Sequence, residues 1–306
     1  MIRPTRLQKG DTIGVIAPAG PVDEEKLMQA APFFERMGLH IKWGKHIHQV
    51  HGYLAGTDEE RLADFHAMIA DPDIKAIIFA RGGYGTGRIA SFIDYDLVRQ
   101  NLKIIWGYSD ITYLHTTIRQ ATGLVTFHGP MLASDISKDD FDVLSASMFS
   151  QLFTPATLIY SEEIAPLHVH ATGEATGELV GGNLSLLASA IGTPFEIDTK
   201  GKILLLEDIG EEPYQVDSML NQLKLAGKLS EAAGIVVGDF ADAEPKLKRS
   251  LTLEQVFNHY FNSLKVPVMS GFKIGHCLPH FAVPLGVDAT LSTAAKTLTV
   301  LPGVTY

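Results

Sequence analysis

The sequence predicts an α/β protein with an N-terminal domain built on a doubly wound, mainly parallel sheet and a C-terminal mixed α/β domain with antiparallel strands. Three observations lead to this prediction. In the first half, short apolar runs alternate with segments of helical periodicity, which is the order of repeated βα units. The run at residues 74–79 is almost wholly apolar, as in a strand covered on both faces. Near the C-terminus, residues 281–291 and 296–301 alternate in the manner of antiparallel strands.

The expected elements of the first half have recognisable start and stop signals. Asp23 is placed to cap a helix that runs to about Met37, and Gly38 follows as its stop. Thr57 and Glu60 form the pattern of a capping box at the start of another helix. Further strands are expected at residues 12–17, 39–43, 104–106 and 125–127, and further helices at residues 111–118 and 141–153.

The second half repeats the alternation after a weaker connecting pattern. Residues 154–172 lack clear periodicity, so we expect an N-terminal domain at 1–153, a linker at 154–172 and a C-terminal domain at 173–306. Pro213 begins a helix in this domain and Gly227 follows its end. We expect strands at residues 173–180, 202–206, 233–237 and 266–270, and helices at 184–191, 213–225 and 252–263, with Gly181-Gly182-Asn183 before the first of these helices.

The composition excludes several classes of protein. The chain has 306 residues, of which 46% are hydrophobic and 20% charged, and this fits a well-packed globular protein rather than a disordered chain. The formal net charge is −10 and Lys and Arg form no basic stripe, so nucleic acid is not an expected partner. Cys277 is the one cysteine, which leaves no intrachain disulfide to form.

The N-terminal sequence and the hydropathy pattern predict a cytoplasmic protein that does not enter the membrane. The apolar run among the first residues spans only about six positions, which is shorter than the core of a signal peptide. No stretch approaches the roughly 18 apolar residues that a membrane-spanning helix needs. A cytoplasmic location is therefore the expectation.

The stretch Leu102–Ile118 predicts a strand, a sharp turn and a helix, and Ser109 stands in the turn. In open α/β sheets, ligands bind at the carboxyl ends of the strands, and a helix that begins there turns free N–H groups toward the same space. Ser109 is therefore a candidate nucleophile. It is also a suitable helix N-cap, as is Asp110. The motif G-x-S-x-G is not met, because Ile111 occupies the position of its second glycine.

A glycine-rich loop follows the expected strand at 74–79. Its sequence is Ala80-Arg81-Gly82-Gly83-Tyr84-Gly85-Thr86-Gly87. Glycines allow a backbone to approach a ligand closely, so the loop is a candidate anion site whose N–H groups face a substrate or an oxyanion. The alternative is a mobile turn between a strand and a helix. The P-loop pattern is absent, because no Gly-Lys-Ser/Thr occurs.

A serine nucleophile needs a base and an acid that orients the base. Glu207 ends the strong apolar run at 202–206 and is the candidate acid, with the alternative that it is one of several surface acids. Its competitors are Asp208, Glu211 and Glu212. His276 is the candidate base, because Gly275 leaves room beside its ring, and His280 is its rival.

Two other groups of residues suggest different chemistry. His46, His48 and His51 form H-x-H-x-x-H, a pattern that can bind zinc, but they lie in a polar loop with no frame to fix their spacing. Solvated histidines are therefore expected, and no metal site is predicted. Cys277 adjoins His276, but adjacent residues of an extended segment point apart, so Cys277 is expected to be a packed residue rather than a nucleophile.

Taken together, these segments resemble the LD-carboxypeptidases, serine peptidases that are also called muramoyltetrapeptide carboxypeptidases. The resemblance extends over essentially the whole chain. Each motif is weak alone, but their joint occurrence in this order is specific to the family. The motifs are IAPAGP, AGTDEERL, ARGGYG, GYSD, FHGPM, GGNL, LLLEDI, and GH followed by PLG.

The resemblance implies a Ser–Glu–His triad, which the match to GYSD, LLLED and GH assigns to Ser109, Glu207 and His276. It also implies an oxyanion hole made by the backbone N–H groups of Gly83 and Asp110. An active site between two domains and a homodimer are further implications. The implied activity is release of terminal D-Ala from murein tetrapeptides by hydrolysis of an L,D-peptide bond in cytoplasmic cell-wall recycling, with no metal or organic cofactor.

A carboxypeptidase must also bind the terminal carboxylate of its substrate. Arg81 is a candidate for this role, because guanidinium pairs with carboxylate through two hydrogen bonds. Arg88 is its rival, and a structural salt bridge is an alternative for both arginines. Tyr84, in the same glycine-rich loop, is a further candidate for substrate contact.

Two alternative functions remain open at this point. Some members of the same family hydrolyse acyl-nucleotide peptide antibiotics and confer self-immunity, and these carry an aromatic residue on a loop for the nucleobase. Residues 154–172 contain Tyr160 but no Trp, which favours the murein substrate. From a different class, a two-domain α/β chain can be a small-molecule binding protein without catalysis.

Overall fold

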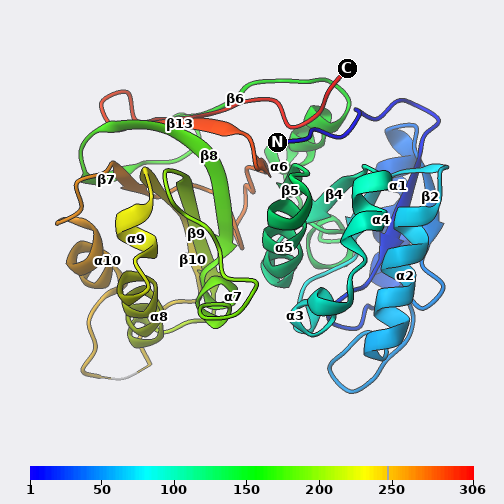
Figure 1. The fold of residues 1–306 in the computed structure, drawn as a ribbon, viewed down its shortest axis with the longest axis horizontal. Helices are drawn as coiled ribbons and strands as arrows, with labels where there is room; N and C mark the ends of the chain where they lie inside the picture. The colour runs from blue at the N-terminus through cyan, green and yellow to red at the C-terminus, as the bar shows by residue number, and fades with distance from the viewer. Residues whose placement is uncertain (247) are drawn as a thin grey trace. The chain divides into compact units, whose positions relative to one another are not determined.

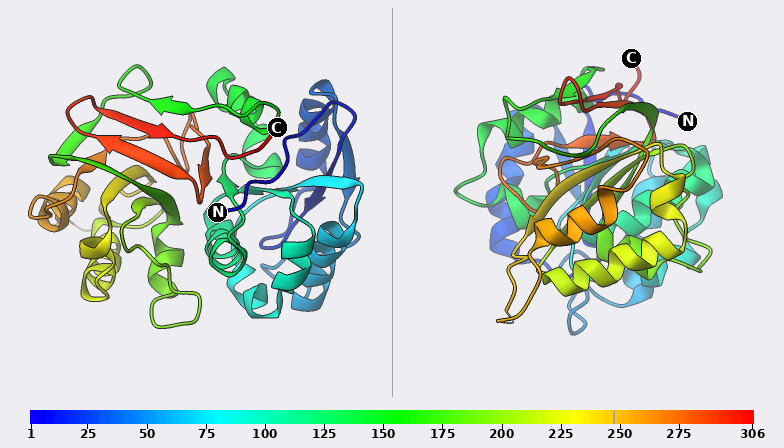
Figure 2. Two further views of the ribbon diagram at one scale, coloured as in Figure 1. Left: turned by 45° about the horizontal axis from the view of Figure 1, so that its top comes forward. Right: turned by 90° about the vertical axis from the view of Figure 1, so that its left-hand side faces the viewer.

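The computed structural model of the chain describes residues 1–246 and 248–306. They form two compact units, of which the first contains Met1–Ala156 and Pro302–Tyr306 and the second contains Thr157–Leu301 (Figures 1 and 2). The five C-terminal residues group with the first unit because Thr305 pairs with Thr5 and the Nε of Arg3 donates to the carbonyl of Pro302 at 2.7 Å.

The first unit is a doubly wound α/β structure. Its strands are β1 (Thr12–Ile16), β2 (His40–Trp43), β3 (Ile74–Phe79), β4 (Ile104–Gly107) and β5 (Thr126–His128). Its α-helices are α1 (Glu24–Arg36), α2 (Asp58–Ala70), α3 (Thr86–Ile89), α4 (Tyr95–Gln100), α5 (Thr112–Thr122) and α6 (Val143–Ser147). Short 3₁₀ turns at Ala90–Phe92, Ser109–Ile111 and Met148–Leu152 and a π-helical turn at Leu132–Ile136 complete it.

Within this unit the strands lie in the order β5-β4-β3-β1-β2, and every neighbouring pair is parallel. Helices α2, α4 and α5 cover one face with apolar side chains such as Phe65, Val98 and Leu114. On the other face, Trp106 stacks on Phe149 with ring centroids 4.3 Å apart. The strand order reverses between β1 and β3, so the crevice at their carboxyl ends is the place where such sheets bind ligands.

The second unit is a mixed α/β structure. Its strands are β6 (Leu158–Tyr160), β7 (His168–Ala171), β8 (Glu174–Asn183), β9 (Ile203–Ile209), β10 (Gly234–Ala241), β11 (Val268–Ser270), β12 (Val283–Leu285), β13 (Asp288–Ser292) and β14 (Thr297–Val300). Its helices are α7 (Leu184–Ser189), α8 (Pro213–Leu225), α9 (Lys228–Glu231) and α10 (Leu253–Phe261).

The sheet of the second unit has the order β6-β14-β13-β8-β9-β10-β11-β7. Strands β8 to β11 are parallel, whereas β13, β14, β6 and β7 pair antiparallel to their neighbours. Helices α8 and α10 lie side by side and bury a core with α7 and α9 (Figures 1 and 2). The predicted fold class, a parallel doubly wound sheet followed by a mixed sheet with antiparallel strands, is confirmed.

Several local predictions are confirmed. The side chain of Asp23 accepts from the N–H of Glu25 and caps α1. Thr57 and Glu60 form the predicted capping box of α2. Helix α8 spans Pro213–Leu225, as its proline start and glycine stop predict. Across residues 1–246 and 248–306, no helix is both long enough and apolar enough to cross a membrane.

Two local predictions differ from the structure. The helix expected at 141–153 is a short α6 followed by a 3₁₀ turn, because Met148 and Phe149 turn inward to pack. The stretch 154–172, expected as a linker, contains β6 and β7, which pair with β14 and β11.

His115 of α5 is buried behind β4. It is 1% exposed, and its Nε2 donates to the carbonyl of Gly107 at 2.8 Å. Burial lowers the pKa of His115 to about 3, because the charged form would lose its hydration. The native first unit therefore holds this imidazole neutral at pH values at which an unfolded chain would protonate it.

We expect His115 to make the first unit sensitive to acid. Below pH 6.5 the unfolded chain binds a proton that the native unit does not bind until about pH 3, so the free energy of unfolding falls by about 1.4 kcal/mol per pH unit within this window. His115→Gln removes this contribution and flattens the dependence accordingly. Urea unfolding between pH 7 and 4 measures it through tryptophan fluorescence, since both tryptophans, Trp43 and Trp106, lie in the first unit.

The exposed His48 provides the matched control, because His48→Gln changes the same residue type without removing a buried imidazole. This control should keep the acid sensitivity of the wild type. If His115→Gln kept it as well, another group would have to carry the effect.

Candidate functional site

Ser109 occupies a sharp turn between β4 and α5. Its φ is +64°, a left-handed conformation that costs a non-glycine residue about 1–2 kcal/mol. The residue is partly exposed, whereas its neighbours Tyr108 and Asp110 are buried. A serine held in a strained strand-to-helix turn presents its Oγ at the edge of the sheet, as nucleophilic serines of α/β hydrolases do. The N-cap alternative is not supported, because Ser109 makes no side-chain cap bond to the helical turn that follows.

The glycine-rich loop after β3 packs directly against this turn. A Cβ atom on Gly82 would lie 2.9 Å from both Cβ and Oγ of Ser109, so only glycine fits there. The carbonyl of Gly82 accepts from the N–H of Gly20, in the loop after β1, at 3.2 Å. Gly83 follows as an exposed residue. The loop therefore lies beside Ser109 at the point where the strand order reverses. This is the loop for which the sequence predicts an anion site.

Asp110 joins the serine turn to the same loop. Its Oδ2 accepts from the N–H of Thr86 at 2.8 Å, and its carbonyl accepts from the Thr86 hydroxyl at 2.5 Å. The carboxyl is 2% exposed, and burial raises its pKa, although the Thr86 N–H opposes the rise. The backbone N–H of Asp110 follows the nucleophile directly, which is the usual position of one oxyanion donor in strand–turn–helix nucleophile sites.

In the second unit the structure brings Glu207 and His276 together. Nδ1 of His276 donates to Oε2 of Glu207 at 2.8 Å. The Glu207 side chain is fully buried within β9, and the His276 side chain is 13% exposed. The sequence predicts that Gly275 leaves room beside the ring of His276. In the structure Gly275 leaves room for the carboxylate instead, because a Cβ atom at this position would lie 2.7 Å from Oε2 of Glu207. The carboxylate fixes the tautomer in which Nδ1 carries the hydrogen and Nε2 is the basic nitrogen of the ring.

The other acids of this segment have different roles. The carboxylate of Asp208 accepts from Nδ2 of Asn183 and from the N–H and hydroxyl of Ser185, and it fastens β9 to the start of α7. Burial raises the pKa of Asp208, and the neighbouring Glu207 adds to the rise. Glu212 accepts from the N–H of Lys246 at 2.9 Å. Burial also raises the pKa of Glu211. Of these acids, Glu207 is the one found hydrogen-bonded to His276.

The loop that carries His276 is supported from below by Tyr160 of β6. The Tyr160 hydroxyl accepts from the N–H of Lys273 at 2.8 Å, and its ring packs on Phe272 and Phe281. The tyrosine is fully buried, and burial raises its pKa to about 12. His280, the rival base, is 1% exposed and lies in the interior. Sγ of Cys277 donates to the carbonyl of Pro279 at 3.4 Å.

A largely apolar cavity of about 580 Å³ adjoins the glycine-rich loop in the first unit. It is lined by Gly20, Pro21, Tyr53, Arg81, Gly83 and Tyr84. Nε and Nη1 of Arg81 donate to the carbonyls of Gly82 and Pro21, and these bonds hold its guanidinium in place. Arg88, its rival, instead forms a bidentate pair with Asp58, with Nη2 and Oδ2 at 2.9 Å, and this pair lowers the pKa of Asp58.

Tyr53 is a lining residue that the sequence did not identify. Its ring packs edge-on to Tyr84 with centroids 5.8 Å apart, and the two side chains are 69% and 55% exposed. It stands in a tight turn closed by the bridge between His51 and Leu54, some thirty residues before the glycine-rich loop. The sequence carries no periodic signal for such a position, because only the fold brings this turn to the loop.

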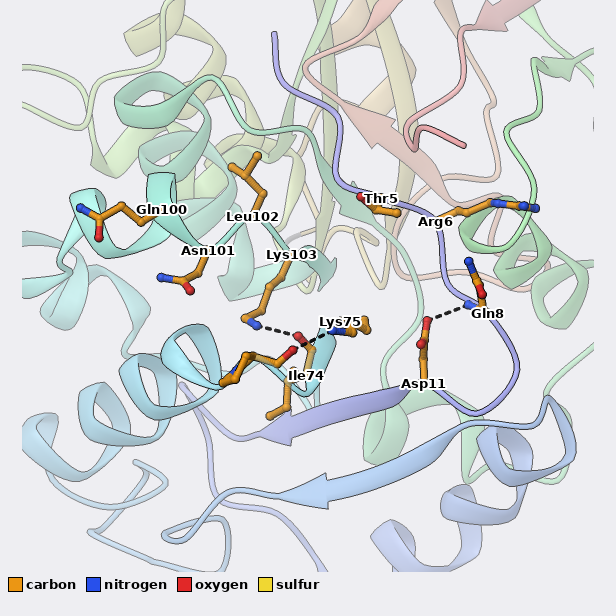
Figure 3. A pocket seen from close by; sticks show the side chains of 11 residues that line it. Thr5, Arg6, Gln8, Asp11, Ile74, Lys75, Gln100, Asn101, Leu102 and Lys103 are labelled. Atoms are coloured by element: carbon orange, nitrogen blue, oxygen red, sulfur yellow. Dashed lines mark hydrogen bonds between the residues drawn. The ribbon is translucent and has the colours of Figure 1, made fainter.

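Two other groups of residues have structural explanations. Nδ1 of His46 pairs with Asp64 at 2.9 Å, and among residues 1–246 and 248–306 no three His, Cys, Asp or Glu side chains are grouped as metal ligands. A cavity of about 460 Å³ at the amino ends of β1 and β3 contains two lysines (Figure 3). Lys103 donates to the carbonyls of Asp71 and Ile74 at 2.6 Å, and Lys75 donates to that of Pro72. The two ammonium groups therefore bind backbone carbonyls between the end of α2 and the start of β3.

Comparison with known proteins identifies the family of the chain. Residues 13–129 match the LD-carboxypeptidase N-terminal domain, and residues 176–291 match the LD-carboxypeptidase C-terminal domain. A probable murein peptide carboxypeptidase of Bacillus subtilis is 57% identical over 99% of this chain and 95% of its own. The chain therefore belongs to the LD-carboxypeptidase family and is a serine peptidase, a hydrolase. A function limited to binding is set aside.

Solved structures of relatives have the same fold. The muramoyltetrapeptide carboxypeptidase from Oxalobacter formigenes is 30% identical, with a TM-score of 0.86 over 96% of this chain and 100% of its own. The microcin C7 self-immunity protein MccF of Escherichia coli is 27% identical over 96% of this chain and 94% of its own. A structure of MccF in complex with glutamyl sulfamoyl guanosine matches with 25% identity and a TM-score of 0.89 over 98% of both chains.

We expect Glu207→Gln to impair catalysis without unfolding the second unit. The amide keeps the size of the buried side chain, but it no longer stabilises a charged imidazole, so kcat should fall by about 10³–10⁴-fold. Peptide hydrolysis by the purified variant measures the loss, and circular dichroism verifies its fold.

The matched control is Glu211→Gln, which removes a neighbouring acid that makes no bond to His276 in the structure. It should keep kcat within a few-fold of the wild type. Equal losses in the two variants would contradict the assignment of Glu207 as the acid that orients the base.

Proposed function

We propose that the protein is a serine carboxypeptidase that hydrolyses the L,D-peptide bond before the terminal D-Ala of murein tetrapeptides. The observation that carries the mechanism is the backbone of Ser109, whose φ of +64° presents a partly exposed hydroxyl beside a glycine-rich loop. The substrate class is supported by the relatives named for murein peptides, at 57% and 31% identity.

In the proposed reaction, Nε2 of His276 takes the proton of Ser109 as Oγ attacks the scissile carbonyl. The N–H groups of Gly83 and Asp110 donate to the oxyanion that forms, and each good donor contributes about 3–4 kcal/mol. The protonated His276 then gives its proton to the nitrogen of D-Ala as the C–N bond breaks. His276 then removes a proton from water as the water oxygen attacks the acyl carbon, and the protonated His276 returns this proton to Oγ of Ser109 as the ester bond breaks. Glu207 holds the imidazole throughout.

Arg81 is proposed to bind the carboxylate of D-Ala. Its Nε and Nη1 already donate to backbone carbonyls, which fixes the guanidinium, and Arg81 lines the cavity. A guanidinium held in this way recognises an anion without a large loss of side-chain entropy. Tyr84 and Tyr53 supply the apolar walls of the same cavity.

An alternative within the family is hydrolysis of acyl-nucleotide peptide antibiotics, and the likeness to MccF supports it. That function calls for an aromatic side chain presented to a nucleobase. Tyr160, the aromatic residue that the sequence offered for this role, is fully buried under the His276 loop. This observation favours the murein substrate.

The proposal includes a cytoplasmic role in cell-wall recycling and assembly as a homodimer. Both follow from the resemblance of the sequence to the family. Cell fractionation tests the location, and light scattering of the purified protein tests the dimer.

The wild type should release D-Ala from an L,D-linked murein tetrapeptide, and Ser109→Ala should lose this activity by about 10⁴-fold or more. EDTA in a parallel sample should leave the rate unchanged. The loss follows because the oxyanion donors remain but no acyl-enzyme can form. Mass spectrometry of the products measures both. A folded wild type that released no D-Ala would overturn the murein assignment, and acyl-nucleotide substrates would then be tested.

Substitution of Arg81 by Gln should mainly affect recognition of the terminal carboxylate. We expect kcat/KM for the tetrapeptide to fall by about 10–100-fold, because a charged hydrogen bond contributes about 1.5–3 kcal/mol. The same peptide with a C-terminal amide lacks the partner of Arg81, so the variant and the wild type should cleave it with similar kcat/KM. Equal losses on both peptides would show that Arg81 does not bind the carboxylate.

A further inference from the structure

One peptide group of the glycine-rich loop is held at both of its ends by buried charged side chains. Its carbonyl, that of Gly85, accepts from Nη1 of Arg61 at 2.9 Å. Its N–H, that of Thr86, donates to Oδ2 of Asp110 at 2.8 Å. Arg61 is 1% exposed and Asp110 is 2% exposed. The 85–86 peptide group is therefore bonded to a positive side chain at its carbonyl and to a carboxylate at its N–H. Both side chains are buried, and hydrogen bonds are electrostatically stronger inside a protein than in water.

Arg61 connects this peptide group to two further segments. Nη1 also donates to the carbonyl of Pro18, in the loop after β1, and Nη2 pairs with Asp58 at the start of α2. A Cβ atom on Gly85 would lie 2.7 Å from Nη1, so the guanidinium reaches the loop only because this residue is glycine. The loops after β1 and β3 are thus fastened to one arginine of α2.

The same contacts set the geometry of the proposed oxyanion hole, so the inference rests on the proposed function. The two proposed donors are the backbone N–H groups of Asp110 and Gly83. The carboxylate of Asp110 also holds Thr86, which lies three residues after Gly83. On the other side of Gly83, Gly82 is pressed against Ser109. The segment that bears the Gly83 N–H is therefore fixed at both ends relative to the serine turn.

We propose that Arg61 and Asp110, through their side chains, are positioning residues that hold the Gly83 N–H at its working distance from Ser109. Neither side chain touches the substrate in this role. Preorganised donors are worth most when they need no rearrangement as charge develops, so a loose loop should weaken transition-state binding more than substrate binding. The fork of a guanidinium reaches two carbonyls and a carboxylate at once, which an ammonium group cannot do with the same geometry.

The test compares Arg61→Lys, Asp110→Ala and Asp110→Asn with the wild type, each checked for cooperative thermal unfolding. We expect Arg61→Lys and Asp110→Ala to lower kcat by about 10²–10³-fold, the loss seen when one oxyanion donor is removed, with KM within about 3-fold. Asp110→Asn keeps an acceptor for the Thr86 N–H and should recover most of the activity. A merely structural role would not divide kcat from KM in this way.

Arg88→Gln is the matched control, because it breaks a side-chain pair with the same Asp58 but keeps the one bond of Arg88 to the 85–86 peptide group, from its backbone N–H to the carbonyl of Gly85 at 3.1 Å. It should keep kcat within about 2-fold. If Asp110→Ala does not fold, Arg61→Lys and Asp110→Asn decide the matter. Folded Arg61→Lys with kcat within 3-fold of the wild type, or a loss confined to KM, overturns the proposal.

A fluorophosphonate that labels reactive serines separates this proposal from the choice of substrate. Its phosphoryl oxygen enters the oxyanion hole, so the labelling of Ser109 should slow in Arg61→Lys by a factor similar to that in kcat. If the wild type releases no D-Ala but labels faster than the variant, the substrate assignment fails and the positioning role stands. Equal labelling of the two overturns the positioning role, and a wild type that does not label overturns the oxyanion site with it.

Discussion

The left-handed backbone conformation of Ser109 is the constraint that its neighbours in the first unit maintain. A serine with φ of +64° is strained, and such a conformation persists only where its surroundings determine it. Here the residues on both sides of Ser109 are held by hydrogen bonds. The carbonyl of Gly107 accepts from His115, the hydroxyl of Tyr108 donates to Asp135 at 2.9 Å, and Asp110 holds Thr86. The serine cannot relax without breaking bonds of residues on both sides, so the strain is kept at the edge of the sheet.

The second unit holds a buried carboxylate within a strand. Glu207 is fully buried in β9, and burial of an unpaired charge is costly. Its bond to His276 offsets part of this cost, and the space for the pair comes from Gly275, where a side chain would strike the carboxylate. Tyr160 supports the same loop through Lys273. Glu207 and His276 are thus placed by a strand and by a loop that Tyr160 supports.

Sequence reasoning predicted the parts of this structure that depend on local signals. The strand–turn–helix around Ser109, the capping box at Thr57 and the helix from Pro213 each follow from residues a few positions apart, and all three are present. The helix expected at 141–153 was wrong, because the aromatic packing of Phe149 against Trp106 overrides helical continuity.

The candidate site divides in the same way. Ser109, Glu207 and His276 were found by pattern and by resemblance, because each ends or follows an apolar run. Tyr53 and Arg61 were missed, since their roles depend on contacts with a loop more than twenty residues away. Arg61 in particular looks like an ordinary charged residue of an amphipathic helix, and only its burial shows otherwise.

The pairing of Thr305 with Thr5 means that the chain passes from the first unit to the second after Ala156 and returns after Leu301. The second unit is therefore an insertion into the first rather than an appendage. A single cut between the units would leave both halves still joined by the other crossing. A fragment ending at Ala156 would lack the segment Pro302–Tyr306, so an autonomous version of the first unit has to be a composite of two stretches. The second unit, in contrast, is one uninterrupted stretch of the chain.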